Sequence, residues 1–179
     1  MRITGGALKG RIVEVPGGVI RPAMDRMRES VFGALGDLTG LSFLDLFSGS
    51  GIIALEAASR GANPVEAVEM DSIKRKTLID NVSLSPVRIH CRFMAAELYV
   101  RRAKTPFDII FCDPPFPYQF KWELAASIAA SPLMQSGSRL LIHRPRQDAP
   151  ELPMEALAVL AHEESRTYGR SVVDFFKRI

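Results

Sequence analysis

The sequence has little that would cross-link the chain or anchor it in a membrane. Only two of its 179 residues are cysteines, Cys91 and Cys112, and no CxxC pair is present. Disulfide frameworks and zinc sites need paired cysteines, so two lone thiols indicate buried side chains in a reducing compartment. No apolar run approaches the ~20 residues that span a bilayer. We therefore expect a cytoplasmic protein with no membrane segment.

Other absences exclude further classes. The first residues, Met1 to Gly6, lead into Gly, Lys and Arg and not into an apolar stretch, so we expect no secretory signal. Histidine occurs only at His90, His143 and His162, far apart, and we interpret all three as structural residues. The sequence therefore predicts no metal site. With 47% hydrophobic and 24% charged residues and no repeat, the chain fits one folded domain.

Positive charge is concentrated at one end of the chain. Residues 1–28 carry a net charge of +4, whereas the whole chain has +3. A glycine-rich, basic, mobile arm is a common footprint of proteins that meet phosphate backbones, and a solvated terminus without a partner is the alternative. We therefore divide the chain into a basic N-terminal arm, 1–22, and a folded domain, 23–179. The candidate RNA-binding residues are Arg2, Lys9, Arg11, Arg21, Arg26 and Arg28.

The rest of the chain alternates between helical and strand patterns. Helical spacing of apolar residues predicts helices over 24–38, 52–59, 72–84, 97–103 and 122–130. Apolar runs predict strands over 42–47, 65–69, 87–93, 107–112 and 138–143, followed by an antiparallel hairpin of 163–168 and 171–177. This alternation is typical of a parallel sheet covered on both faces. The terminal hairpin favours the α/β class I methyltransferase (Rossmann-like) fold, a seven-stranded, mostly parallel sheet.

A glycine turn follows the first predicted strand. Residues 49–54, Gly-Ser-Gly-Ile-Ile-Ala, fit G-x-G-x-x-G/A, and Glu69 ends the next strand. Such a turn lets backbone approach a nucleotide-like cofactor, and the acidic residue binds ribose hydroxyls. The motif alone leaves NAD and S-adenosylmethionine open. Asp45 tilts the choice, because its carboxylate beside the turn would repel a pyrophosphate and attract an ammonium group.

A second motif, Asp113-Pro114-Pro115-Phe116, follows the fourth strand. Two prolines stiffen the turn and remove two N–H donors, which leaves a carboxylate beside free carbonyl groups. Such an acceptor pair suits an amino group, and the Phe116 ring offers a face to a planar base. Two acceptors on the exocyclic amine of a nucleobase would direct its lone pair toward a sulfonium methyl group. The alternative is an ordinary loop.

The chain resembles a known family over nearly its whole length, the bacterial 16S rRNA (guanine(966)-N2)-methyltransferases. The N-terminal stretches that carry the resemblance are Met1-Arg2-Ile3, Gly5, Lys9-Gly10-Arg11, Arg21-Pro22 and Asp25 to Phe32. The remaining stretches are Leu44 to Gly51, Val68 to Asp71, Phe107-Asp108, Asp113 to Phe116 and Tyr168-Gly169. The N-terminal stretches are particular to this family, whereas the glycine and Asp-Pro-Pro-Phe turns are shared with many amino-methyltransferases.

The resemblance implies a role for each matching position. The catalytic residues, which hold the guanine, would be Asp113, Pro114, Pro115 and Phe116. The residues that bind S-adenosylmethionine would be Asp45, Phe47, Ser48, Gly49, Ser50, Gly51, Glu69, Met70, Met94 and Ala95. Helix 24–38 would lie over the cofactor pocket. Two departures stand out: Ala23 replaces a capping threonine, and Met94-Ala95 replace an Asp or Asn that commonly contacts adenine, which leaves that contact to backbone or Glu97.

The implied substrate is a guanine of 16S rRNA in the small ribosomal subunit or its assembly intermediate, and the expected state is a monomer. A DNA adenine-N6 or cytosine-N4 methyltransferase would use the same chemistry. However, 61 residues between Gly51 and Asp113 and 63 after Phe116 leave no room for a target-recognition domain. A dehydrogenase would need a hydride-transfer acid, for which no candidate is present. A non-catalytic RNA-binding assembly factor on the same fold is the remaining alternative.

Overall fold

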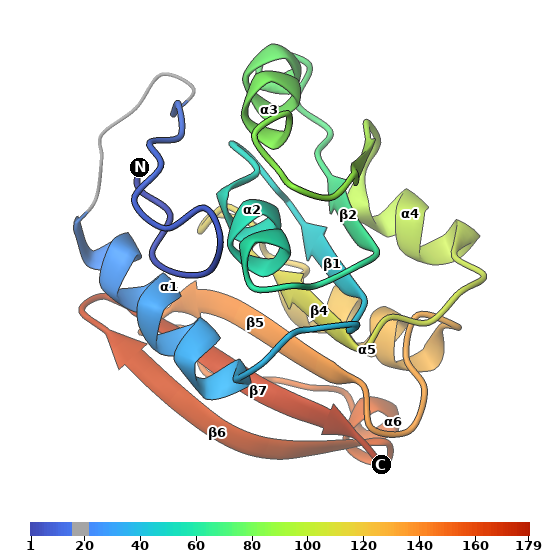
Figure 1. Ribbon diagram of the computed structural model, residues 1–179. Coiled ribbons are helices and arrows are strands. Elements are labelled where there is room, and N and C mark those ends of the chain that lie inside the picture. The colour runs from blue at the N-terminus through green and yellow to red at the C-terminus, as the bar shows by residue number, and fades with distance from the viewer. Residues whose placement is uncertain (16–21) are drawn as a thin grey trace.

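A computed structural model describes residues 1–15 and 22–179. Its centre is a seven-stranded sheet in the order β3-β2-β1-β4-β5-β7-β6. Strand β7 runs antiparallel to the other six strands. The strands are β1 Phe43–Leu46, β2 Val65–Val68, β3 Ile89–Arg92, β4 Ile109–Cys112, β5 Arg139–Pro145, β6 Leu160–Tyr168 and β7 Ser171–Arg178. The predicted class I methyltransferase sheet and its C-terminal hairpin are confirmed (Figure 1).

Helices cover both faces of the sheet (Figure 1). They are α1 Pro22–Leu35, α2 Ile52–Ser59, α3 Arg75–Val82, α4 Ala96–Arg102, α5 Lys121–Ala130 and α6 Met154–Leu157. Apolar residues of α1, α2 and α3 pack into one core, and those of α4, α5 and α6 pack into a second core on the other face. The two central strands, β1 and β4, are therefore buried along their whole length, as strands covered on both faces must be.

The predicted elements are all present, but some bounds were wrong. The first helix ends at Leu35 and not at residue 38, because Gly36 has φ 77°, a left-handed conformation that closes a helix. The third helix begins at Arg75, since residues 72–74 form a turn instead. The short helix α6 was not predicted: its four residues are too few to show a helical period.

The N-terminal segment 1–15 is folded, which corrects the expectation of a mobile arm. Ile3 and Val13 are buried in the core that α1 and α2 share, and a β-bridge joins Arg2 to Ile12. Figure 1 shows the segment beside α2. The segment buries Ile3, Leu8 and Val13 and keeps Lys9 and Arg11 in solvent. The boundary of the predicted arm, residues 16–21, lies outside the described residues.

Buried charges attach this segment to the domain. The Glu56 carboxylate is fully buried and accepts hydrogen bonds from Thr4, from Nε of Arg28 at 3.1 Å and from Arg60. Arg28 is equally buried and also donates to the Arg2 carbonyl and to Asp25. The two charges stabilise each other where water cannot reach them.

We expect Glu56→Gln to lower the free energy of unfolding by about 3–5 kcal/mol, because it leaves the Arg28 guanidinium buried without its counter-charge. Urea denaturation measures this value. The matched control is Glu164→Gln, because Glu164 pairs with Arg166 and the two side chains are 42% and 33% exposed, so its loss should cost about 0–1 kcal/mol. Equal losses in the two variants would contradict the assignment.

Candidate functional site

The main cleft opens where the carboxyl ends of β1 and β4 meet. It has a volume of about 960 Å³, within the range of small-molecule sites. The order of the strands reverses here, since β1 leads outward to β2 and β4 leads outward to β5. Ligands of open parallel sheets bind at such a switch point. Phe47, the Asp-Pro-Pro-Phe turn and Met24 of α1 line the cleft, whereas Asp45 and residues 48–51 are not part of its lining.

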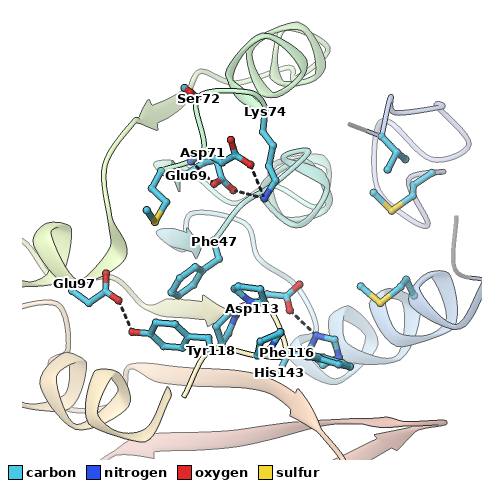
Figure 2. Close-up of a pocket in the computed structure, with 17 residues that line it drawn as sticks. Phe47, Glu69, Asp71, Ser72, Lys74, Glu97, Asp113, Phe116, Tyr118 and His143 are labelled. Atoms are coloured by element: carbon cyan, nitrogen blue, oxygen red, sulfur yellow. Dashed lines mark hydrogen bonds and ion pairs between the residues drawn. The ribbon is translucent and has the colours of Figure 1, made fainter. Parts of the chain in front are cut away.

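The glycine turn takes a conformation that few other residues tolerate. Gly49 and Gly51 have φ of 58° and 81°, and Phe47 has φ of 63°, which is strained for a bulky side chain. A Cβ on Gly51 would lie 2.7 Å from Cδ1 of Leu78, so only glycine lets α2 and α3 pack here. The ring of Phe47 reaches the cleft between Glu69 and Asp113 (Figure 2).

Asp45 of β1 is buried beneath the turn. Its Oδ2 accepts hydrogen bonds from Ser48 Oγ at 2.5 Å and from the Ala54 backbone N–H of α2 at 3.1 Å. Its Oδ1 is buried and has no partner among the described residues. Burial disfavours the charged carboxylate and raises the pKa of Asp45 to about 8. A cationic group at Oδ1 would supply the missing partner and restore the charged form.

Glu69 directly follows β2 and faces the cleft from the other side. Its carboxylate accepts the backbone N–H of Gly49 and that of Asp71, both at 2.8 Å. Lys74 Nζ lies 3.8 Å from it and 3.7 Å from Asp71 (Figure 2). Met70 is exposed and lines the same wall. The predicted acidic residue therefore lies at the turn, in hydrogen-bond contact with its first glycine.

The Asp-Pro-Pro-Phe turn forms the opposite wall. Asp113 follows β4, and Phe116 lies beside it with about a third of its surface exposed. Pro114 and Pro115 complete the turn, and all four residues line the cleft. The structure thus places this turn at the cavity that is also lined by Phe47, two positions before Gly49, and by Glu69, which accepts the Gly49 N–H.

His143, which we interpreted as merely structural, lies in this site. Its Nδ1 is 2.7 Å from Oδ1 of Asp113, and its ring meets that of Phe116 edge-on at 5.6 Å (Figure 2). The sequence gives no local signal of this contact. It depends on β4 and β5 pairing in register, Cys112 beside Ile142, which makes Asp113 and His143 neighbours.

The predicted adenine contacts are only partly in place. Neither Met94 nor Ala95 is among the residues that line the cleft, since Met94 packs against the second core and Ala95 precedes α4. Glu97 does line it and accepts a hydrogen bond from the Tyr118 hydroxyl. Burial and this bond both raise the pKa of Tyr118, so its hydroxyl stays a donor.

Asn81 on α3 is a residue that sequence reasoning missed. Its side-chain amide donates to the carbonyls of Ser50 and Glu14, and its oxygen accepts the Glu14 backbone N–H. It therefore ties the N-terminal segment to the glycine turn. Asn81 closes a contact over 67 positions, and no sequence pattern marks such a bridge.

The predicted RNA-binding residues separate into two groups. Arg2, Lys9, Arg11 and Arg26 are exposed, whereas Arg28 is fully buried in its contacts with Glu56 and Asp25. Arg28 therefore cannot meet a phosphate backbone in this structure, and its assignment was wrong. Arg21 lies outside the described residues.

In residues 1–15 and 22–179, no helix has the length and apolar character needed to cross a membrane. Within the same ranges, no cluster of three or more His, Cys, Asp or Glu side chains could hold a metal ion.

The sheet order and the glycine turn after β1 define a class I methyltransferase fold. The family model described as Conserved hypothetical protein 95 matches residues 1–177, and the chain belongs to this family.

Three relatives are similar to this chain. Ribosomal RNA small subunit methyltransferase D of Escherichia coli is 37% identical over 65% of this chain, a stretch that spans 60% of that relative's length. YlbH of Bacillus subtilis, provisionally named an rRNA methyltransferase, is 31% identical over 99% of both chains. The solved structure of yhhF from Escherichia coli, provisionally described as a methyltransferase, superposes with a TM-score of 0.86. It is 28% identical and covers 99% of this chain and 97% of its own.

Proposed function

We propose that the protein transfers a methyl group from S-adenosylmethionine to the exocyclic N2 of a guanine in 16S rRNA, at the position equivalent to guanine 966. One observation carries the proposal: the unpaired Oδ1 of buried Asp45 lies on β1, and the Asp113 carboxylate follows the adjacent strand β4 and lines the cleft. The first suits a cationic amino acid group and the second suits a base amine. The names of the relatives support the substrate class.

The residues present fit S-adenosylmethionine. Asp45 offers an unsatisfied acceptor for the ammonium group, and the turn around Gly49 leaves space where a Cβ would otherwise stand. Glu69 provides a carboxylate for ribose hydroxyls, and Met70 offers an exposed apolar face for adenine. The cofactor, when bound, supplies an activated sulfonium methyl group.

The Asp-Pro-Pro-Phe turn would hold the base. Phe116 would stack on the guanine, and Asp113 with a neighbouring backbone carbonyl would accept the two N2 hydrogens and direct the nitrogen lone pair outward. In the transfer, a bond forms between N2 and the methyl carbon while the sulfur–methyl bond breaks, and S-adenosylhomocysteine leaves. N2 then carries one extra proton, which passes to the Asp113 carboxylate or to water. To reach this site the guanine must leave its stack, as in other base-modifying enzymes.

The decisive experiment is transfer of tritium from labelled S-adenosylmethionine to small ribosomal subunits, total rRNA, total tRNA and duplex DNA. We expect label in small subunits or their assembly intermediates, and N2-methylguanosine after digestion. Label in DNA alone would establish the alternative methyltransferase, and no label in any substrate would favour a non-catalytic assembly factor.

We propose that the protein acts in the cytoplasm and as a monomer.

RNA binding is proposed to use the exposed side chains of the N-terminal segment. Replacing Arg2, Lys9 and Arg11 together by alanine should flatten the slope of log affinity against log salt by about two units, because each lost phosphate contact removes about 0.7–0.9. Filter binding of small subunits across a salt series measures the slope. S-adenosylhomocysteine binding should not change, since these side chains do not line the cleft.

The matched control removes three positive charges elsewhere: Arg101, Lys104 and Lys177. All three are exposed and lie near the amino ends of β4 and β5, whereas the cleft lies at the carboxyl ends of the parallel strands. This variant should keep the slope of the wild type. If both triple variants lose the same slope, the N-terminal segment has no special part in RNA binding.

A further inference from the structure

His143 contacts both residues that hold the base in the proposed function. It stands on β5 beside the end of β4, where the register places it next to Asp113. Its Nδ1 lies 2.7 Å from Oδ1 of Asp113, and its ring meets the Phe116 ring edge-on, with an interplanar angle of 67°. Only 2% of the side chain is exposed. It therefore forms the floor beneath the two groups that would touch the substrate (Figure 2).

The chemistry of the contact decides which nitrogen carries the hydrogen. An ionised carboxylate only accepts hydrogen bonds, so Nδ1 of His143 must be the donor to Asp113. In the neutral ring, Nε2 is then an acceptor. Nε2 is buried and has no partner among the described residues. A buried polar atom without a partner disfavours folding, and a leucine would fill the same space without that cost.

The free-energy cost of the unpaired Nε2 is offset, because His143 fixes the orientation of the Asp113 carboxylate. Held at Oδ1, Asp113 cannot rotate freely about its Cβ–Cγ bond, so Oδ2 keeps one direction. No donor among the described residues contacts Oδ2, and the Asp113 side chain is 25% exposed toward the cleft that it lines. The same imidazole ring restricts Phe116 from below.

We propose that His143 is a positioning residue for methyl transfer, which fixes Oδ1 of Asp113 and the ring of Phe116 so that Oδ2 of Asp113 faces the substrate amine. The proposal rests on the proposed function, since it assumes that Asp113 and Phe116 hold a base. His143 touches neither substrate nor cofactor. It acts through orientation, on which rates depend strongly, because a displacement of about 1 Å can cost about a hundredfold.

The test compares His143→Asn with His143→Leu. The asparagine amide nitrogen occupies nearly the place of Nδ1 and can donate to Asp113, whereas leucine fills the space without a donor. We expect kcat on small subunits to fall about 10- to 100-fold in the leucine variant and to stay within about threefold of the wild type in the asparagine variant. The affinity for S-adenosylhomocysteine should stay within about twofold in both. A leucine variant with a wild-type kcat, or an asparagine variant as slow as leucine, would overturn the proposal.

If the leucine variant does not fold, His143→Gln replaces it, because its amide nitrogen reaches the place of Nε2 and leaves Nδ1 unfilled. A second measurement does not depend on activity. Long-range 1H–15N NMR of the wild type should show a proton on Nδ1 of His143, and this proton should be lost or shifted in Asp113→Ala. A bare Nδ1 in the wild type would refute the contact. If the wild type methylates no RNA, the proposed function fails, while the NMR result still decides the contact.

Discussion

Replacing Asp113 by alanine should reduce methyl transfer to small ribosomal subunits at least a hundredfold, while the affinity for S-adenosylhomocysteine stays within about twofold. The carboxylate is the charged acceptor on the base side of the cleft, and loss of one such electrostatic group costs about 10²–10³ in kcat in other enzymes. The cofactor side has its own carboxylates, Asp45 on β1 and Glu69 just after β2. Single-turnover transfer and calorimetric titration measure the two quantities separately.

The control for this variant is Asp80→Ala. Asp80 is a half-exposed carboxylate on α3 that pairs with Lys76 and does not line the main cleft, so its loss should leave transfer unchanged. Full activity of Asp113→Ala would show that another group accepts the amine. A parallel loss of cofactor affinity would show instead that Asp113 shapes the cofactor side of the cleft.

Binding of S-adenosylhomocysteine should strengthen as pH rises, by up to about tenfold per unit between pH 6 and about 7.5. The pKa of Asp45 is about 8 because of burial, so in this range the free protein carries a proton there. The ligand ammonium needs the ionised carboxylate, and binding must therefore release that proton. The rise ends near pH 8, because Asp45 of the free protein is then already ionised and binding releases no further proton. Calorimetry in buffers of different ionisation enthalpy counts the released protons.

Asp45→Asn is the matched variant, because it keeps the shape and the acceptor oxygen but cannot ionise. We expect it to bind S-adenosylhomocysteine about a hundredfold more weakly at pH 7.5, with a nearly flat pH profile. A pH slope that survives in the variant would locate the titrating group elsewhere.

Stability of the free protein provides an independent check on Asp45. A carboxyl whose pKa is raised on folding binds its proton more tightly in the folded chain. Its contribution to the free energy of unfolding is therefore complete below about pH 4 and declines as the pH rises to about 8. The wild type should lose this part of its stability over that range relative to Asp45→Asn, and denaturant titrations at several pH values measure it.

The order of elements and both binding turns could be predicted because their signals are local. The spacing of apolar residues that predicts a strand or a helix can be seen within a short stretch of consecutive residues. The glycine turn needs left-handed backbone at Gly49 and Gly51, which only a few residue types adopt readily. The Asp-Pro-Pro-Phe turn is likewise rigid through its own prolines. That both turns lie at the same end of the sheet follows from the general rule for parallel sheets, since β1 and β4 are neighbours.

The tertiary structure alone decided which charged and polar side chains face solvent and which meet each other. Arg26 and Arg28 are both arginines of α1, two positions apart, and only Arg28 is buried. It pairs with the buried Glu56, which lies 28 positions away in the sequence. The N-terminal segment is basic and rich in glycine, yet it folds because Ile3 and Val13 find a core built from distant helices. His143 meets Asp113 only through the register of two strands 30 positions apart. Contacts of this kind depend on long-range pairing, and the residues around each side chain do not indicate which distant residue it will contact.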